Sequence, residues 1–253
     1  MRNAHAIIVL VTRHARRKLA MFFQKLCGEE FLATIAKSNG STRGIVSDID
    51  DTLCDTWIDW IRMTFTTLGN PEGLSPEKFR EQYGKIYLAP YFRDHPELWD
   101  WIQRLRYSSD AHSEARPIDG AREALHLISG CGAVSSGTRL LGYLTARVET
   151  LYQTTKDWLI CHGFPDAPII MPPRDIAYPR AIKWKASILH QGYPAVRGII
   201  DDDPLLVEEL ELIGAYKGLV WLFNHETGSY PFAIPYPCHM RAGELILPRI
   251  CGD

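Results

Sequence analysis

Short apolar runs and amphipathic stretches alternate along most of the chain. The apolar runs carry many β-branched residues, which is typical of strands buried in a parallel sheet; they are residues 44–48, 140–145, 169–171, 197–200 and 218–223. Between them, apolar residues at helical spacing predict helices over 121–130, 147–161, 181–190 and 205–213. Strands alternating with such helices indicate an α/β fold, a Rossmann-like parallel sheet flanked by helices.

Residues 56–116 have a different pattern. The segment is rich in aromatic residues, mostly helical in period, and shows no strand-like alternation. A helix start at Ser75-Pro76-Glu77 follows a break at Gly69 to Gly73. The pattern predicts a small helical cap inserted after the first strand. Its tryptophans are expected to lie in the cap core, with stacking on a base as the alternative; they are Trp57, Trp60, Trp99 and Trp101.

The remaining segments complete the expected domain organisation, in which residues 41–55 and 117–225 form the α/β core. Residues 1–40 form a basic, amphipathic segment whose apolar positions from Leu19 to Ile35 suit one face of a helix. The alternatives for this segment are packing on the body, a weak contact with a membrane surface, or a disordered extension. Residues 226–253 contain four prolines, at 231, 235, 237 and 248, and are expected to be an irregular tail.

The overall composition narrows the function classes. A formal net charge of -2 gives no global signature of nucleic-acid binding, so no nucleic-acid polymer is expected as a partner. No apolar run approaches the roughly 20 residues that a transmembrane helix needs. The six cysteines are dispersed without a C-x-x-C pair, which favours free thiols in a reducing compartment over a disulfide framework or a zinc site. A cytoplasmic location is expected.

Polar residues cluster where the predicted strands end. Asp48 and Asp50 follow the first strand, Thr145 ends the second, and Asp201 and Asp202 follow a later one. Ligands of parallel sheets sit beyond the carboxyl ends of the strands, so three distant segments are expected to converge on one edge. Crowded carboxylates need a cation or another compensating partner, which suggests a metal and a reacting group. A solvated acidic loop is the alternative for Asp48 and Asp50 taken alone.

Taken together, the ordered motifs resemble the haloacid dehalogenase superfamily, and more closely its magnesium-dependent phosphatases. The motifs are D-x-D-x-T at Asp48, Asp50 and Thr52, an apolar strand ending at Thr145, a helix lysine, and Ile199-Ile200-Asp201-Asp202. The resemblance implies that Asp48 attacks phosphorus to form an aspartyl phosphate. It implies that Asp50 protonates the leaving oxygen and then activates water. Family dehalogenases lack this second aspartate, so carbon–halogen cleavage is not expected.

The same resemblance assigns the groups that bind the phosphoryl oxygens. Thr145 and backbone N–H groups at the following helix start would donate hydrogen bonds to them, and Thr52 is a substrate-binding candidate. Lys185 would offset the charge of the carboxylates and the phosphoryl group; it fits the family pattern better than the alternative, Lys183. If these residues do not form a site, Thr145 is expected to cap the following helix and Lys185 to be a solvated surface residue.

A Mg²⁺ ion is the cofactor that the resemblance implies. Asp48, the backbone carbonyl of Asp50, and Asp202 would be its protein ligands, with Asp201 as the alternative ligand or as a neighbour of the ligands. Asp203 precedes Pro204 at a helix start, where an N-cap role is expected.

Within the superfamily, the segment around Arg147 is similar to the nucleotidase-type branch. Leu144-Thr145-Ala146-Arg147 is followed by Trp158-Leu159 and His162-Gly163-Phe164, although Val148 stands where that branch has proline. Arg147 either contacts phosphate or pairs with an acid at the helix start. The expected function is therefore a Mg²⁺-dependent phosphomonoesterase for a small phosphorylated substrate, with a nucleotide as the first class to test. The alternatives are a phosphomutase or phosphotransferase, and a non-catalytic scaffold that binds phosphorylated ligands or proteins.

Overall fold

The computed structural model describes residues 24–38, 43–131, 138–176, 178–226 and 230–250. Its centre is a seven-stranded sheet of order β1-β4-β3-β2-β5-β6-β7, and every neighbouring pair is parallel. The strands are β1 (Lys25–Leu26), β2 (Arg43–Ser47), β3 (Thr138–Leu144), β4 (Ile169–Ile170), β5 (Val196–Asp201), β6 (Leu219–Phe223) and β7 (Ala233–Tyr236). The predicted α/β fold with a Rossmann-like parallel sheet is confirmed.

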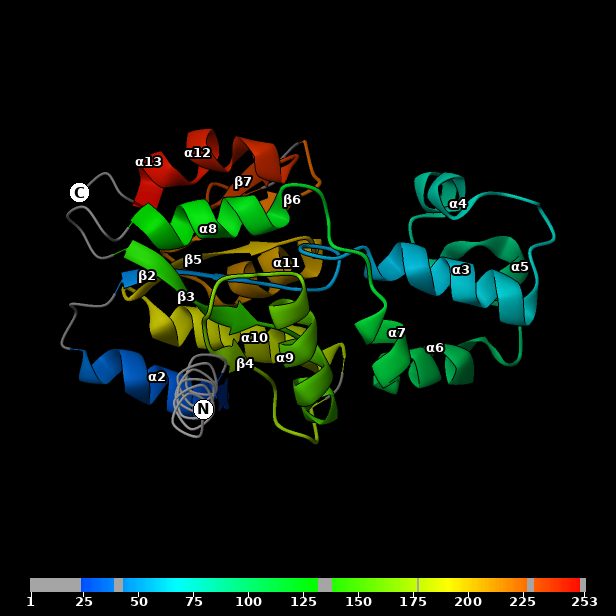
Figure 1. Cartoon of the computed structure of the whole chain (residues 1–253), viewed down its shortest axis with the longest axis horizontal. Coiled ribbons are helices and arrows are strands. Elements are labelled where there is room, and N and C mark those ends of the chain that lie inside the picture. Colours follow the sequence, from blue (N-terminus) through cyan, green and yellow to red (C-terminus); the bar gives the residue numbers. More distant parts are fainter. Residues whose placement is uncertain (1–23, 39–42, 132–137, 177, 227–229, 251–253) are drawn as a thin grey trace, which may run out of the picture.

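Helices cover both faces of this sheet because successive strand residues point to opposite sides. Ile45 and Ile200 pack into one core, whereas their neighbours Val46 and Ile199 pack into the other. The first core is covered by α8 (Ala121–Cys131), α9 (Tyr152–Cys161), α12 (Ala242–Leu245) and α13 (Leu247–Ile250), and the second by α2 (Gly28–Lys37), α10 (Arg180–Gly192) and α11 (Pro204–Ile213). The short helix η2 (Glu149–Leu151) directly precedes α9. Figure 1 shows α8, α12 and α13 together on one side of the sheet, with α2 and α10 on the other.

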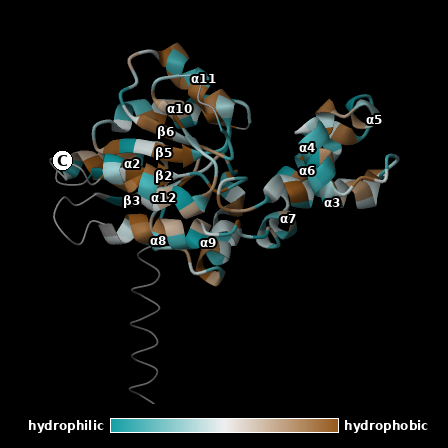
Figure 2. Ribbon diagram, turned by 90° about the horizontal axis from the view of Figure 1, so that it is seen from above, coloured by the Kyte–Doolittle hydropathy of each residue, from teal (hydrophilic) through white to brown (hydrophobic). Residues whose placement is uncertain are grey.

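The helices between β2 and α8 form a cap beside the sheet. They are α3 (Thr56–Leu68), α4 (Pro76–Tyr83), η1 (Ile86–Leu88), α5 (Pro90–Arg93), α6 (Leu98–Tyr107) and α7 (Ser109–Ser113). Residues such as Phe79, Phe92 and Leu98 give the cap a hydrophobic core of its own. Figure 2, seen from above, shows the cap set apart from the body of the core. The predicted helical cap is confirmed, although the strand before it is the second of the described strands, because β1 precedes β2.

Both ends of the chain differ from their predicted structure. Leu26 lies in β1, which pairs with β4, so a single helix from Leu19 to Ile35 is wrong for the described part; residues 1–23 lie outside it. The tail from 226 is not irregular: β7 pairs in parallel with β6 and is followed by η3 (His239–Arg241), α12 and α13. Pro235 does not prevent this strand because β7 is an edge strand, where a missing N–H is tolerated.

Two other sequence-level expectations concern thiols and membranes. Four cysteines within the described ranges are free thiols, as expected: Cys27, Cys54, Cys161 and Cys238. Across the segments that the structure describes, the helices are all too short or too polar to cross a lipid bilayer.

Candidate active site

The loop after β2 is folded tightly at the carboxyl edge of the sheet. The Asp48 N–H donates to the carbonyl of Ile200 in β5 (2.9 Å), and the Leu53 N–H turns back to the carbonyl of Ile49 (2.7 Å). Asp51 has a φ of 54°, a left-handed conformation that aspartate tolerates better than most residues. Its carboxylate accepts the backbone N–H of Trp57 (3.0 Å) at the start of α3. The loop that carries Asp48 is therefore fixed to the first cap helix.

Lys185 lies at the centre of the acidic cluster. Its Nζ is 3.0 Å from Oδ1 of Asp48 and 2.9 Å from Oδ2 of Asp201, and the side chain is buried. Burial opposes its positive charge, but the two carboxylates outweigh burial and raise the pKa of Lys185. By contrast, Lys183 is exposed and lies 3.6 Å from Glu209. Of the two candidate lysines, the fold therefore places Lys185 in the site.

Three carboxylates converge beside Lys185 and fit a divalent cation. Asp48, Asp201 and Asp202 each offer an oxygen, and these oxygens lie within 4.8 Å of one another. Burial raises the pKa of Asp48 to about 8, against the pull of Lys185. Burial, followed by the charges of Asp51, Asp201 and Asp48, raises the pKa of Asp202 well above its usual value. One lysine does not balance this charge, and carboxylate oxygens are the ligands that Mg²⁺ prefers, so the donor set fits that ion.

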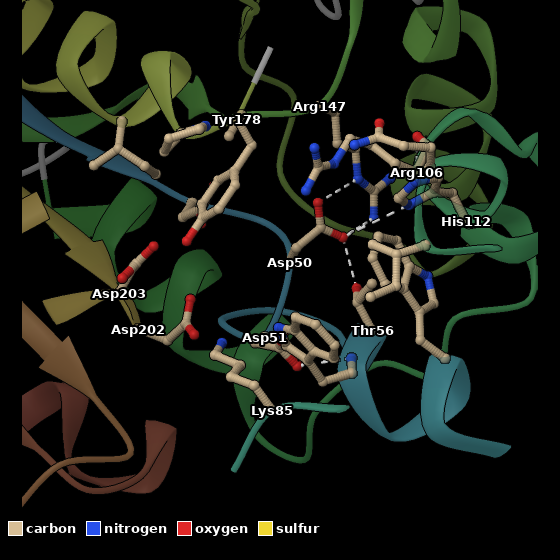
Figure 3. A pocket seen from close by; sticks show the side chains of 18 of the residues that line it. Asp50, Asp51, Thr56, Lys85, Arg106, His112, Arg147, Tyr178, Asp202 and Asp203 are labelled. Atoms are coloured by element: carbon tan, nitrogen blue, oxygen red, sulfur yellow. Dashed lines mark hydrogen bonds and ion pairs between the residues drawn. The ribbon is translucent and has the colours of Figure 1, made fainter. Parts of the chain in front are cut away.

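Asp50 points away from this cluster and is held by Arg147. Arg147 Nε and Nη2 donate to the two Asp50 oxygens at 2.9 and 2.7 Å, and the Thr56 hydroxyl donates to Oδ1 at 2.6 Å (Figure 3). His112 of the cap helix α7 brings Nδ1 to 3.7 Å from Oδ1. Although burial raises the pKa of Asp50, Arg147 and His112 outweigh it and hold that pKa well below its usual value. While it is paired with Arg147, Asp50 is thus held as an ionised carboxylate, which opposes both uptake and donation of a proton.

The threonines and Arg147 make other contacts than the sequence suggests. The Thr145 hydroxyl is buried and accepts the backbone N–H of Arg147 (3.1 Å). The Thr52 hydroxyl donates to Oδ1 of Asp202 (3.4 Å), so its observed contact is with one of the three clustered carboxylates. Arg147 pairs with Asp50, which lies in the loop after β2, rather than with an acid at the start of the helix that follows Arg147. Asp203 caps α11 as expected, because its carboxylate accepts the N–H of Leu205 (3.0 Å).

Several residues of the site have no signal in the sequence. His112 lies on α7 of the cap and comes to 3.7 Å from Asp50 only through the fold, since no ligand-like spacing marks it in the sequence. In the sequence, Thr56 is marked only by its position at the start of a predicted helix. His225, after β6, brings Nε2 to 3.2 Å from the backbone carbonyl of Asp202. These contacts depend on which segments the fold brings together.

His239 ties the C-terminal segment to the loop that carries Asp48. Its Nε2–H donates to the carbonyl of Thr52 (2.6 Å), and the Tyr236 hydroxyl lies 3.3 Å from Nδ1. The ring stacks on Phe223 with 4.4 Å between centroids. Burial lowers the pKa of His239 to about 4, against the opposing effect of the bond to Thr52. The C-terminal segment therefore supports the active-site loop through a neutral histidine.

Acidification is expected to weaken this support. The pKa of a histidine is near 6.5 in the unfolded chain and about 4 here. The neutral ring therefore stabilises the fold fully above pH 6.5, and this contribution falls as the pH drops towards 4. Between pH 7 and pH 4 the wild type should lose about 3 kcal/mol more unfolding free energy than His239→Gln. Urea denaturation of both proteins at several pH values measures this; equal losses would contradict it.

A cavity of about 480 Å³ lies between the cap and the sheet edge. Asp48, Asp50, Asp202 and Lys185 line its inner part, and aromatic residues of the cap line much of the rest. Figure 3 shows Tyr178, Lys85 and Arg106 around the carboxylates of Asp50 and Asp202. The site therefore has room for a phosphoryl group and for a leaving group attached to it.

Comparisons with known proteins identify the fold. No protein-family model and no curated protein matches the chain. Among solved structures, it is similar to the crystal structure of a HAD-superfamily hydrolase, subfamily IA, variant 1, from Geobacter sulfurreducens. The TM-score is 0.50 at 12% identity, and the match covers 80% of this chain and 95% of the other. The chain thus has the fold of haloacid dehalogenase superfamily hydrolases, as its motifs indicate. At this identity the likeness concerns the fold, so the activity is argued from the site.

Proposed function

We propose that the protein is a Mg²⁺-dependent phosphomonoesterase that acts through an aspartyl phosphate on Asp48. The observation that carries this proposal is the position of Asp48: it lies at the sheet edge in the cavity, 3.0 Å from buried Lys185 and beside the carboxylates of Asp201 and Asp202. Phosphoryl transfer from a monoester requires a nucleophile and positive charge to stabilise the phosphoryl oxygens. Here these would be supplied by the Asp48 carboxylate, by Lys185 and by a metal bound to the clustered carboxylates.

The reaction then proceeds in two displacements. A carboxylate oxygen of Asp48 attacks phosphorus, and the bond from phosphorus to the leaving oxygen breaks. Water attacks the aspartyl phosphate, transfers a proton to Asp50, and releases phosphate and the free Asp48 carboxylate. Lys185 offsets negative charge throughout, and the cap limits access of bulk water. Mg²⁺, held by Asp48, Asp202 and the Asp50 carbonyl, with Asp201 adjacent, would supply charge stabilisation for the phosphoryl oxygens.

Asp50 has a second role in this proposal, as the acid that protonates the leaving oxygen. The bidentate pair with Arg147 opposes that role because it keeps Asp50 ionised. We propose that the arriving phosphoryl group draws Arg147 away from Asp50, so that Arg147 binds phosphate and Asp50 can take up a proton. Thr145 and Thr52 are further candidates for contact with the substrate, as the family pattern implies.

The tight Asp50–Arg147 pair also favours one alternative function. A base held by a buried arginine activates water poorly, which prolongs the life of an aspartyl phosphate. A phosphotransferase or phosphomutase uses such a lifetime to pass the phosphoryl group to an alcohol. The product distinguishes the two functions: inorganic phosphate for the hydrolase, and a new phosphomonoester for the transferase.

Metal dependence is the first test of the proposed activity. Purified protein with Mg²⁺ is expected to release inorganic phosphate from a panel of nucleotides, sugar phosphates and phospho-amino acids. Removal of the metal with EDTA should reduce turnover by about 100-fold or more, because the clustered carboxylates then repel the phosphoryl group. Mg²⁺ should restore turnover. Equal phosphate release with and without EDTA would contradict the metal's role.

Two further parts of the proposal concern setting and substrate. The free thiols of Cys27, Cys54, Cys161 and Cys238 support a reducing compartment, and we propose the cytoplasm. We propose a small phosphorylated metabolite as the substrate, and nucleotides are the first class to test. The cavity volume of about 480 Å³ supports a substrate of this size.

A further inference from the structure

The cavity extends well beyond the groups that would handle a phosphoryl group. Its inner part is formed by the carboxylates and Lys185, whereas the cap side is formed by Trp57, Tyr87, Trp99 and Ile102, among others. The core contributes Tyr178, Pro179 and Ile182 opposite the cap. The leaving group of a phosphomonoester bound at Asp48 would therefore meet rings and aliphatic side chains.

The cap rings form one continuous surface. Tyr87 stacks on Trp99 with 5.5 Å between ring centroids and 26° between planes, and Trp57 meets Tyr87 edge-on at 6.5 Å. These contacts fix the rings against one another. Trp99 nevertheless remains 56% exposed, and Tyr178 on the core side remains 36% exposed. Two aromatic side chains of the cavity thus keep surface available to a ligand.

Two cationic side chains lie over aromatic rings of the cavity. Lys85 Nζ lies 4.8 Å from the centroid of the Trp57 ring, and the Arg106 guanidinium lies 5.1 Å from that of Tyr178. Arg106 belongs to α6 of the cap and Tyr178 to the core, so this contact joins the two walls. Of the described carboxylates, none lies within 4.0 Å of either cation. The positive charge beside the rings favours an electron-rich, planar group.

Hydrogen-bond acceptors for sugar hydroxyls are few on the cap wall, whose polar lining includes the cations Lys85 and Arg106. Among the described residues of the cap that line the cavity, Gln103 is the only side-chain amide, and none is a carboxylate. The hydroxyls of a polyhydroxylated leaving group would meet mainly donors there, so the hydrogen bonds that they donate to water would not be fully replaced, which is costly. A planar aromatic group loses little and gains stacking on the exposed rings.

We propose that this cavity selects phosphomonoesters whose leaving group carries a planar aromatic ring, which binds between the Tyr87–Trp99 pair of the cap and Tyr178 of the core. The inference rests on the proposed phosphatase function and names its substrate class. The ring can belong to a nucleobase or to an aryl group, since both offer the same flat π surface.

Substrate pairs in which both leaving groups are primary alcohols test this selection with little difference in chemical reactivity. Benzyl phosphate is compared with cyclohexylmethyl phosphate, and adenosine 5′-monophosphate with ribose 5-phosphate. The aromatic member of each pair is expected to have a kcat/KM about tenfold or more above its partner. Selectivity in both pairs supports the inference. Selectivity in the benzyl pair alone identifies an aryl group, and selectivity in the nucleotide pair alone identifies a nucleobase. Equal values in both pairs overturn it.

Variants of the cap rings locate the selectivity. Trp99→Leu and Tyr87→Leu are expected to bring the benzyl to cyclohexylmethyl ratio of kcat/KM close to one. Tyr107→Leu is the matched control, because Tyr107 lies on the same helix α6, is 49% exposed and does not line the cavity. Its ratio should equal that of the wild type. An unchanged ratio in both cap variants, each folded by circular dichroism, overturns the assigned position of the ring.

A binding measurement separates this inference from the proposed function. Calorimetric titration with Mg²⁺ compares benzylphosphonate with cyclohexylmethylphosphonate, neither of which can be hydrolysed to an alcohol and phosphate. Tighter binding of benzylphosphonate without turnover of any phosphate ester would support the aromatic binding site and contradict the proposed phosphatase activity. Turnover without selectivity in either assay would support the phosphatase activity and contradict the aromatic binding site.

Discussion

Replacement of Asp48 by asparagine is expected to reduce phosphate release by about 10⁴-fold or more, because an amide cannot form the aspartyl phosphate. The substitution keeps the shape of the side chain and an oxygen that can accept a hydrogen bond from Lys185. Asp201 remains as the charged partner of that lysine at 2.9 Å. The variant should therefore fold, which circular dichroism and a thermal melt can verify. Steady-state release of inorganic phosphate from the best substrate measures the loss.

The matched control is Asp55→Asn. Asp55 lies seven residues after Asp48, on the same connection to α3, and its observed pairing is with Arg80 at 3.6 Å. It does not line the cavity. Its replacement should change kcat/KM by less than about threefold, because the ion pair is partly exposed and lies outside the cavity. Full activity in folded Asp48→Asn would show that another group attacks phosphorus, and the proposed mechanism would be wrong.

Replacement of Lys185 by methionine is expected to lower the free energy of unfolding by about 3–5 kcal/mol. The variant leaves Asp48 and Asp201 buried beside each other without the cation that lies 3.0 and 2.9 Å from them. Methionine has a similar length, so the loss reflects charge rather than volume. Urea denaturation in the absence of divalent cations measures this effect.

Lys183→Met is the control for the loss of a lysine from the same helix. Lys183 is exposed and lies 3.6 Å from Glu209, so its removal should change stability by less than about 1 kcal/mol. Millimolar Mg²⁺ should recover part of the loss in Lys185→Met, since the ion replaces the missing positive charge, and should add less to the control. A Lys185→Met protein as stable as the control would show that the acidic cluster does not need this lysine.

The local pattern of the sequence was sufficient for the core of the fold and for its acidic edge. Apolar β-branched runs such as Ile45–Val46 and Ile199–Ile200 predicted parallel strands, and the residues after them predicted where Asp48 and Asp202 converge. Such features are readable because strand burial and the position of strand ends depend on neighbours in sequence. The same local reasoning failed for 233–236, where prolines suggested an irregular tail. An edge strand accepts them, but only the sheet order shows that β7 is at an edge.

By itself, then, the sequence determined the parallel sheet, the inserted cap and the aspartates at the strand ends, because each depends on a short local pattern. The tertiary structure decided that Arg147 pairs with Asp50, that Lys185 rather than Lys183 joins Asp48, and that His239 reaches the active-site loop. It also decided that Trp99, expected in the cap core, is largely exposed and lines the cavity, whereas Trp57 and Trp60 line the cavity and also pack in or against that core. Periodicity gives the face of a helix but not its partner, because contacts between distant segments depend on how the whole chain packs.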